Sequence, residues 1–336
     1  MHLALDVMGG DHAPTEICRG AVLACREFQD LEIALVGQGP VVERTLEEIG
    51  HKDEKRLHIV HAEETIGMDE SPSVAIRKKR QSSMRIAMEM VRSREAEGCV
   101  SAGNTGAIVA GGVLVVGRIP GIERPALGAP LPVLNRVSLL LDVGATVRCK
   151  PIHLYQFAVM GEVYMRCIMG VQRPEIALLS NGEEEIKGDE VVMEARELLR
   201  KNSFHSFVGY VEGKDVPKGA ADVVVCDGFT GNILLKFGEG IVHGVYDLLR
   251  EELSRRLLPK IGMVFMIPMF KDMWRRFDYE QYGGTPLLGV DGAVVKAHGR
   301  SKAMAISSAL RVARDFAQRK GVAMIREELL QRGDAP

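Results

Sequence analysis

Residues 223–236 read VVVCDGFTGNILLK and carry the local pattern that decides the fold. The apolar run Ala221–Cys226 predicts a strand. It opens onto a small, glycine-rich turn, Asp227–Asn232, and a long helix is expected from there toward Arg256. A strand, a tight turn and a helix in this order form the repeating unit of an α/β protein.

The same unit recurs along the whole chain. Further strands are predicted at Leu3–Val7, Ile33–Val36, Leu57–Val60, Cys99–Ser101, Val137–Val143 and Ile176–Leu179. Helices are predicted from Pro14 to Phe28 and at Ser82–Arg94, Ala107–Val116, Pro151–Met169, Val191–Lys201, Lys302–Arg319 and Ala323–Gln331. Strands that alternate with helices favour an α/β/α sandwich with a mostly parallel sheet. With no Pro/Ser linker and no internal repeat, we expect one domain over residues 1–336, from which residues 255–277 protrude.

Composition narrows the class of protein. Glycine supplies 36 of the 336 residues, about 11% against an average near 7%, whereas aromatic residues make up only 5%. This balance indicates a binding site built largely from backbone amides. The net charge of −2 argues against a dedicated nucleic-acid binder, which usually has a basic excess.

The N-terminus and the cysteines favour a cytoplasmic protein. The start, MHLALDVMGGDHAP, has no basic region, no long apolar run and no cleavage site, so no signal peptide is expected. The six cysteines are scattered without C-x-x-C spacing or a nearby histidine cluster. We therefore expect reduced, buried thiols and no metal site. Cys226 beside Asp227 could serve as a nucleophile, but no histidine follows to activate it.

Several predicted strands end in similar glycine-rich turns. These are residues 8–11, 101–106, 142–145, 182–188 and 227–232. Ligands in open α/β sheets bind beyond the carboxyl ends of the strands, and amides at a following helix attract anions. Each turn alone is best interpreted as a tight connection. Together, on one sheet edge, they predict an anionic and phosphorylated ligand.

The sequence lacks three motifs that would point to a nucleotide cofactor, nucleotide hydrolysis or a serine hydrolase. Gly37-Gln38-Gly39 has Val42 where a dinucleotide fingerprint requires its third glycine. The chain also lacks a G-x-x-x-x-G-K-[ST] loop and a G-x-S-x-G elbow, which disfavours nucleotide hydrolysis and serine-hydrolase chemistry.

Two side chains are candidates for catalysis. Lys187 lies between a strand end and a helix start, where an ammonium could bind phosphate; it could equally pair with one of the glutamates at 183–185. Asn232 could donate its amide to an oxyanion or a phosphate oxygen. Alternatively, Asn232 is a helix N-cap.

The segment Leu257–Phe277 combines an uncharged run with flanking cations and the only tryptophan. Its uncharged run, Ile261–Phe270, is too short to span a bilayer, which takes roughly 20 apolar residues. The whole segment, with its flanking cations, suits the membrane interface. A dimer-interface element and a core hairpin are the alternatives. The expected membrane contacts are Met263, Val264, Phe265, Met266, Ile267, Phe270 and Trp274.

Taken together, the motifs resemble one known family. They are ALDVMGGDHAP, VSAGNTGA, RPALGAPLP, LLLDVGA with CKP and QFAVMG, GEEEIKG, VEGKDV, VVVCDGFTGNILLK, and YGGTPLLGVDG followed by AHGRS. In register from about residue 3 to residue 318, they resemble the bacterial phosphate acyltransferases, which are acyl-ACP:phosphate acyltransferases of phospholipid synthesis (ACP, acyl carrier protein). The sequence departs from the usual pattern at Thr146, Arg148 and Asn181.

The resemblance implies a fold, an activity and a location. The fold would be phosphotransacetylase- or isopropylmalate-dehydrogenase-like, with a protruding amphipathic helical tip, in a homodimer attached peripherally to the cytoplasmic membrane. The enzyme would convert long-chain acyl-ACP and inorganic phosphate to acyl phosphate and ACP, without a cofactor or metal. Its product would pass to the glycerol-3-phosphate acyltransferase of the membrane.

The site residues follow from the resemblance and from the turns. Lys187 would neutralise phosphate, and Asn232, with turn amides near Gly228 and Gly231, would orient phosphate or stabilise the oxyanion. The other phosphate- or substrate-binding candidates are Gly10, Asp11, Ser101, Gly103, Asn104, Thr105 and Asp227. Because ACP is acidic, the basic run Arg77–Arg80 and the cations around Leu257–Phe277 are candidate docking surfaces.

Three rival functions remain open. A short-chain phosphotransacetylase using acyl-CoA would share the fold and the need for phosphate. A metal-dependent hydroxyacid dehydrogenase would need a convergent aspartate cluster. A non-catalytic membrane scaffold for lipid enzymes would explain Leu257–Phe277 but neither Lys187 nor the glycine turns.

Overall fold

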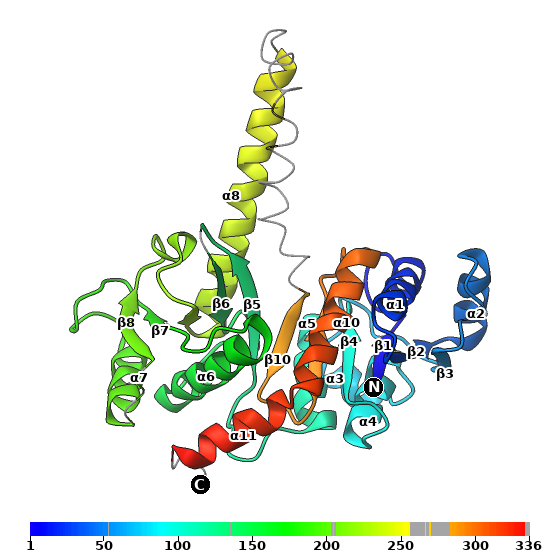
Figure 1. Cartoon of the computed structure of the whole chain (residues 1–336), viewed down its shortest axis with the longest axis horizontal. Coiled ribbons are helices and arrows are strands. Elements are labelled where there is room, and N and C mark those ends of the chain that lie inside the picture. Colours follow the sequence, from blue (N-terminus) through cyan, green and yellow to red (C-terminus); the bar gives the residue numbers. More distant parts are fainter. Residues whose placement is uncertain are drawn as a thin grey trace.

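A computed structural model describes residues 1–332 except residues 53, 135, 203, 205, 256–265, 267–268 and 270–282. The described strands form one 11-stranded sheet in the order β3-β2-β1-β4-β11-β10-β5-β6-β9-β7-β8 (Figure 1). The strands are β1 His2–Asp6, β2 Glu32–Gly37, β3 Leu57–His61, β4 Gly98–Ser101, β5 Ala126–Pro132, β6 Val137–Leu141, β7 Ile176–Leu179, β8 Phe207–Val211, β9 Val223–Val225, β10 Thr285–Leu288 and β11 Ala293–Lys296.

Helices cover both faces of this sheet. The α-helices are α1 Thr15–Glu27, α2 Gly39–Glu48, α3 Pro72–Lys78, α4 Ser83–Arg92, α5 Thr105–Gly111, α6 Pro151–Tyr164, α7 Glu190–Lys201, α8 Gly228–Arg255, α10 Ala303–Gln318 and α11 Gly321–Gln331. Short π-helices extend α5 and α6 at η1 Gly112–Val116 and η2 Met165–Met169, and η3 Val216–Lys218 is a 3₁₀ turn.

The sheet is mostly parallel, as predicted, but its two halves run in opposite directions. The pairs β1–β2, β1–β4, β2–β3, β4–β11, β6–β9, β7–β9 and β7–β8 are parallel. In contrast, β10 is antiparallel to both β11 and β5, and β5 is antiparallel to β6. From β6 to β8, all strands therefore run opposite to β5, whereas β10 alone is reversed in the other half of the sheet.

This reversal corrects one expectation. Strands β1, β4, β11 and β5 end on one side of the sheet, which we call the β4 edge, whereas β6, β9 and β7 end on the opposite side, the β9 edge. The glycine turns after β1 and β4 thus lie at the β4 edge, and those after β6, β7 and β9 lie at the β9 edge. The predicted convergence of all five turns on a single edge is wrong, because apolar periodicity carries no information on strand direction.

Two apolar cores sit on the two faces, because alternate residues of a strand point to opposite sides. On one face, residues such as Leu139 and Leu141 of β6 pack with α1, α6, α10 and α11. On the other face, Leu140 joins residues of α3, α4, α5 and η1. The cysteines follow this pattern: all six are free, and only Cys149 is not fully buried.

A buried carboxylate fixes the loop that follows β6. Asp142 Oδ1 accepts hydrogen bonds from the amides of Leu127, Gly144 and Ala145, and its Oδ2 accepts from the amide of Thr146 at 2.6 Å. Burial raises the pKa of Asp142, although the four amides oppose this shift. The start of β5 and the loop after β6 are therefore held by one side chain.

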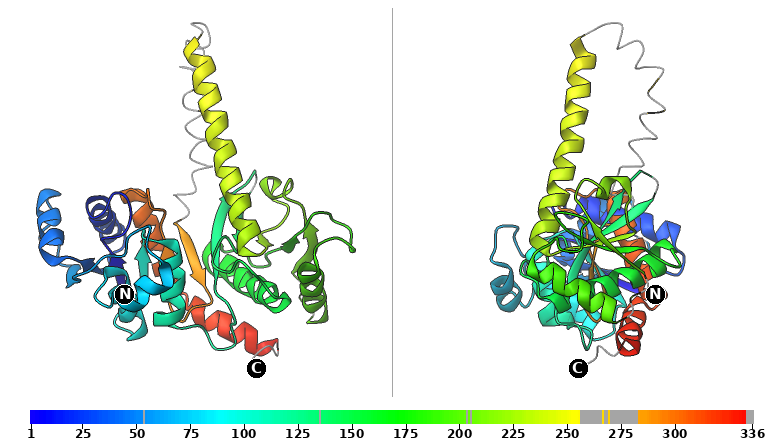
Figure 2. Two further views of the ribbon diagram at one scale, coloured as in Figure 1. Left: turned by 180° about the vertical axis from the view of Figure 1, so that it is seen from behind. Right: turned by 90° about the vertical axis from the view of Figure 1, so that its left-hand side faces the viewer.

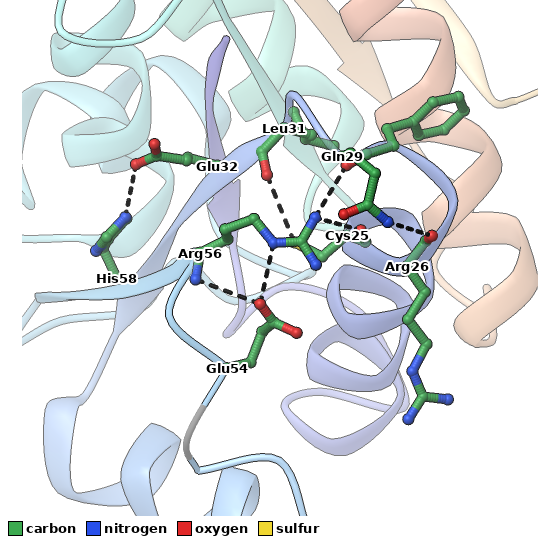
Figure 3. A network of polar contacts seen from close by, with 9 residues as sticks. Cys25, Arg26, Gln29, Leu31, Glu32, Glu54, Arg56 and His58 are labelled. Carbon is green, nitrogen blue, oxygen red and sulfur yellow. Dashed lines mark hydrogen bonds and ion pairs between the residues drawn. The ribbon is translucent and has the colours of Figure 1, made fainter.

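Arg56 makes a similar connection near β3, at one end of the sheet (Figure 3). Its guanidinium donates to the carbonyls of Cys25 and Phe28 and to the Glu54 carboxylate. The carbonyls at the end of a helix lack partners within that helix. Arg56 therefore satisfies the end of α1 and ties it to the chain that enters β3.

Helix α8 leaves the body of the protein. It begins beside the end of β6, runs along the sheet face and projects beyond the β4 edge (Figures 1 and 2). Its outer part exposes large apolar side chains, with Val245 at 52% and Leu248 at 64% exposure. Helix α8 thus projects from the body as far as Arg255, and most of the predicted protrusion, residues 255–277, lies outside the described residues.

The predicted membrane contacts lie just beyond this helix. Met263, Val264, Phe265, Ile267, Phe270 and Trp274 are outside the described residues. Met266 is described and is exposed. No helix in the described part of the chain is both long and apolar enough to cross a membrane.

Candidate active site

A cavity of about 760 Å³ lies on the sheet face between α8 and the central strands. Its floor comes from β5, β10 and β11, and α8 forms one wall. The turn after β1 contributes Asp11, and the turn after β4 contributes Gly103 and Thr105. Four predicted site residues, Asp11, Gly103, Thr105 and Asn232, therefore share one cavity, although they come from opposite edges of the sheet.

One side of the cavity is apolar. It is formed by Leu127, Ala129, Pro130, Leu131, Pro132 and Val133 of β5 and its turn, by Val143, Val216 and Pro217, and by Leu234, Leu235 and Val242 of α8. A surface of this extent suits an alkyl chain better than a small polar substrate.

The other side is polar and rich in cations. Lys236 and Glu239 come from α8, Thr285 from β10, Lys296 from β11, and His298, Arg300 and Ser301 from the following loop. Lys236 Nζ pairs with Glu239 Oε2 at 2.8 Å. The cavity thus places an apolar surface next to a group of cations.

Burial and neighbouring cations both change the pKa values of two basic groups of the cavity, Lys296 and His298. Burial lowers the pKa of Lys296, and the nearby charge of Lys236 lowers it further. Burial also lowers the pKa of His298, as do Lys296 and Lys236. His298 Nδ1 accepts from the amide of Arg300 at 3.2 Å, so the neutral ring carries its proton on Nε2.

The turn after β1 is tied to the loop after β11. The Asp11 amide donates to the Gly299 carbonyl at 2.7 Å. Gly10 has a φ of +100°, and a Cβ there would lie 3.0 Å from that of Ala102. Gly10 thus serves the close packing of two turns and does not itself line the cavity.

In the turn after β4, some residues make structural hydrogen bonds and others line the cavity. Ser101 donates to the buried Asp6 carboxylate at 2.6 Å. Asn104 caps α5 by accepting from the Ala107 amide, and its Nδ2 donates to the Met68 carbonyl at 2.9 Å. Of the predicted polar side chains in this turn, only that of Thr105 faces the cavity.

The turn after β9 shows a similar division. Asp227, not Asn232, caps α8, because its carboxylate accepts from the Phe229 and Thr230 amides. The Gly228 amide donates to the Thr146 carbonyl, and the Gly231 amide donates to the Asp227 carbonyl. The amides of Gly228 and Gly231 themselves are therefore hydrogen-bonded within the protein. The side chain of Asn232 remains available at the cavity wall.

Lys187 lies in the loop after β7, at the β9 edge. Asn181 closes this loop by accepting from the Gly188 amide at 3.0 Å. Lys187 does not line the cavity, and its ammonium has no hydrogen bond or ion pair among the described residues. The alternative of a Lys187–glutamate pair is wrong for Glu185, which binds Arg196 and Arg200 instead.

Lys236, Lys296, His298 and Arg300 are the basic cavity residues that sequence reasoning missed. Residues 294–301 read VVKAHGRS, an apolar run followed by a glycine turn with polar side chains. This is the same signal that identified the other strand ends, and it identifies β11 as well. Among the described residues, no group of three or more His, Cys, Asp or Glu is arranged to hold a metal ion.

Solved structures share this fold. A phosphotransacetylase from Streptococcus pyogenes matches with a TM-score of 0.65 at 17% identity, over 95% of this chain and 94% of its own. A branched-chain phosphotransacylase from Enterococcus faecalis V583 matches with a TM-score of 0.55 at 14% identity, over 94% and 99%. The chain therefore has the phosphotransacetylase-like class of α/β fold that the resemblance implied.

Sequence relatives define the family. A family described as "Fatty acid synthesis protein" matches residues 1–324. Phosphate acyltransferases from Thermoanaerobacter pseudethanolicus and Heliobacterium modesticaldum are 46% and 48% identical, over 99% and 98% of each chain respectively. A third, from Pelobacter propionicus, is 49% identical over 96% of this chain and 92% of its own. The chain belongs to the phosphate acyltransferase family and is a transferase.

The close contact between α8 and the loop after β6 gives a test of this architecture. A Cβ at Gly231 would lie 1.9 Å from the Asp142 carbonyl oxygen. Gly231→Ala should therefore lower the free energy of unfolding by roughly 1–3 kcal/mol, as overpacking does. Urea titration measures it.

The matched control is the same substitution in the same helix. A Cβ at Gly240 would have nothing within 4 Å, so Gly240→Ala should instead stabilise by about 0.5–1 kcal/mol. Equal effects of the two substitutions would contradict the close packing at Gly231.

Proposed function

We propose that this protein transfers the acyl group of a long-chain acyl-ACP to inorganic phosphate, releasing ACP and acyl phosphate for phospholipid synthesis. The observation that carries the proposal is the single cavity in which the apolar side chains of β5 and α8 adjoin Lys296, His298 and Arg300. An acyl chain fits the first surface, and phosphate fits the second.

For this reaction the protein needs to position the two substrates and to stabilise negative charge. Inorganic phosphate is already a nucleophile at neutral pH, so no serine or cysteine nucleophile is needed. Holding phosphate against the thioester carbonyl removes much of the entropic barrier, and a donor aimed at the developing oxyanion lowers it further. Asn232 is the uncharged side chain at the cavity wall best suited to that second role.

The acyl carrier would dock on the basic run 77–80 at the end of α3. Helix α3 begins next to α5, because a Cβ at Gly106 would lie 2.5 Å from Pro72 Cγ. Its far end carries the basic run 77–80, in which Lys79 pairs with Glu70 at 2.6 Å. Arg77, Lys78 and Arg80 are exposed. They supply the positive surface that an acidic carrier requires.

Membrane attachment forms part of the same proposal. The exposed apolar residues of α8 lead directly into segment 255–277, whose sequence combines apolar residues, cations and Trp274. Such a segment can lie in the interface of an anionic bilayer, close to the membrane enzyme that would use the product. The homodimer implied by the resemblance also remains a prediction, which sedimentation velocity tests.

The two catalytic candidates are tested together. Asn232→Ala should lower phosphate-dependent release of ACP from long-chain acyl-ACP, by roughly 10²-fold for a lost oxyanion donor. Lys187→Ala tests the phosphate-neutralising role that the resemblance implies for a residue outside the cavity, and it should lower the same rate. The exposed Lys201, which does not line the cavity, provides the control Lys201→Ala. Near wild-type turnover in both variants would refute these assignments. A parallel assay with acyl-CoA separates the proposal from a short-chain phosphotransacetylase.

Charge reversal tests the docking surface. Arg77→Glu, Lys78→Glu and Arg80→Glu together should raise the KM for acyl-ACP at low salt, and the difference should shrink as salt screens the charges. Lys79 is left intact because of its pair with Glu70. The control carries the same three reversals at the exposed cations Lys55, Arg173 and Lys201. If both triple variants have the same KM, the run 77–80 is not the docking surface.

Vesicle binding tests the membrane segment. Phe265→Asp and Ile267→Asp should reduce co-sedimentation with anionic liposomes, because burying a charge in the apolar boundary is costly. Val208→Asp, on an exposed position of β8, adds the same charge elsewhere. Liposome binding that survives both changes in the segment would rule out this mode of attachment.

A further inference from the structure

Lys296 lies at the end of a central strand of the sheet, between β4 and β10. As the last residue of β11, it pairs in register with Ser101 of β4 and Thr285 of β10. The pairing of Leu287 with Leu127 puts Ala129 of β5 opposite Thr285. Lys296, Thr285 and Ala129 thus form one row across three neighbouring strands, and all three line the cavity.

This row sets the distance between charge and apolar wall. Neighbouring strands lie about 4.8 Å apart, so the backbone of Lys296 is roughly 10 Å from that of Ala129. A lysine side chain spans much of such a gap. An ammonium at this position therefore reaches the end of an acyl group that lies along β5.

The charge of Lys296 is not balanced by any residue in the part of the chain that the structure describes. Among the described residues, its ammonium has no hydrogen bond or ion pair, and the closest acidic influence is Glu239, which is paired with Lys236. Its neighbour Ser101 is engaged with Asp6. Burial and Lys236 both lower the pKa of Lys296, which reflects the cost of this unpaired cation. An anion in the cavity would remove that cost.

We infer that Lys296 is a catalytic residue whose ammonium binds the inorganic phosphate that attacks the acyl thioester; the inference rests on the function proposed above. An oxygen of hydrogen phosphate forms a bond to the thioester carbonyl carbon, and the carbon–sulfur bond breaks. The sulfur leaves as a thiolate and takes up the proton of hydrogen phosphate. The products are acyl phosphate, which keeps two negative charges, and the free thiol. Lys296 stabilises the charge on phosphate throughout.

A phosphate group can reach this site from two sources. One is free inorganic phosphate, and the other is a phosphate ester carried by the acyl donor. The row from Lys296 to Ala129 favours the first, because the cation sits beside the expected acyl group and not farther out toward the donor. The experiment distinguishes the two by which substrate becomes harder to bind.

The test measures both KM values and direct binding. Lys296→Ala should raise the KM for phosphate roughly 10- to 100-fold, the effect of a lost charge-assisted hydrogen bond, and leave the KM for acyl-ACP unchanged. Calorimetric titration with inorganic phosphate alone should show the same loss of affinity. Lys296→Arg, which keeps the charge, should restore part of both. The control is Lys302→Ala, an exposed lysine on the same loop outside the cavity.

Two outcomes of these measurements would overturn the inference. If the KM for acyl-ACP rises and that for phosphate does not, Lys296 binds the donor instead. If Lys296→Ala binds phosphate like the wild type, Lys296 has no role in phosphate binding. Should Lys296→Ala fail to fold, Lys296→Met keeps the length of the side chain and takes its place in both assays. A wild-type protein that releases no ACP with phosphate refutes the proposed function, whereas the phosphate titration still decides on Lys296.

Discussion

The cavity depends on the antiparallel pairing of β5 with β6. If the whole sheet were parallel, every strand would end on one edge, and the ligand would be bound there by turns alone. The reversal places the turn after β9 at the far edge, so α8 must cross the face of the sheet. The cavity is the space between this crossing helix and the central strands. Strand direction, more than any single side chain, brings Asn232 and Thr105 together.

One carboxylate holds this arrangement in place. Asp142 binds four amides from the start of β5 and the loop after β6. That loop presents the Thr146 carbonyl to the Gly228 amide, which fixes the first turn of α8. Thr146 also donates its hydroxyl to the Pro125 carbonyl. The glycines at 228 and 231 are therefore needed for the close packing of α8 against this loop.

The sequence predicts the strands that show up as local apolar runs. It does not predict strand direction or the strands that form only through pairing with their neighbours. Apolar runs such as Val223–Val225 and Ile176–Leu179 identify their strands because side-chain alternation and burial are local. Strand β5 reads ALGAPLP, with two prolines and a glycine that disfavour strands, and β10 and β11 have only four residues each. These three strands form the cavity floor. Asp11, Thr105 and Asn232 were predicted as parts of glycine turns, whereas Lys296 was missed together with its strand.

Helix α8 has its two ends in different surroundings. Its 28 residues correspond to about 42 Å at 1.5 Å per residue, and Val242 is its last residue at the cavity. The remaining turns carry the chain roughly 20 Å farther out. Sites that far apart contribute independently to free energy. Substitutions at the outer end of α8 should therefore change its contacts with a surface or a partner without altering the geometry of the cavity at the base of the helix.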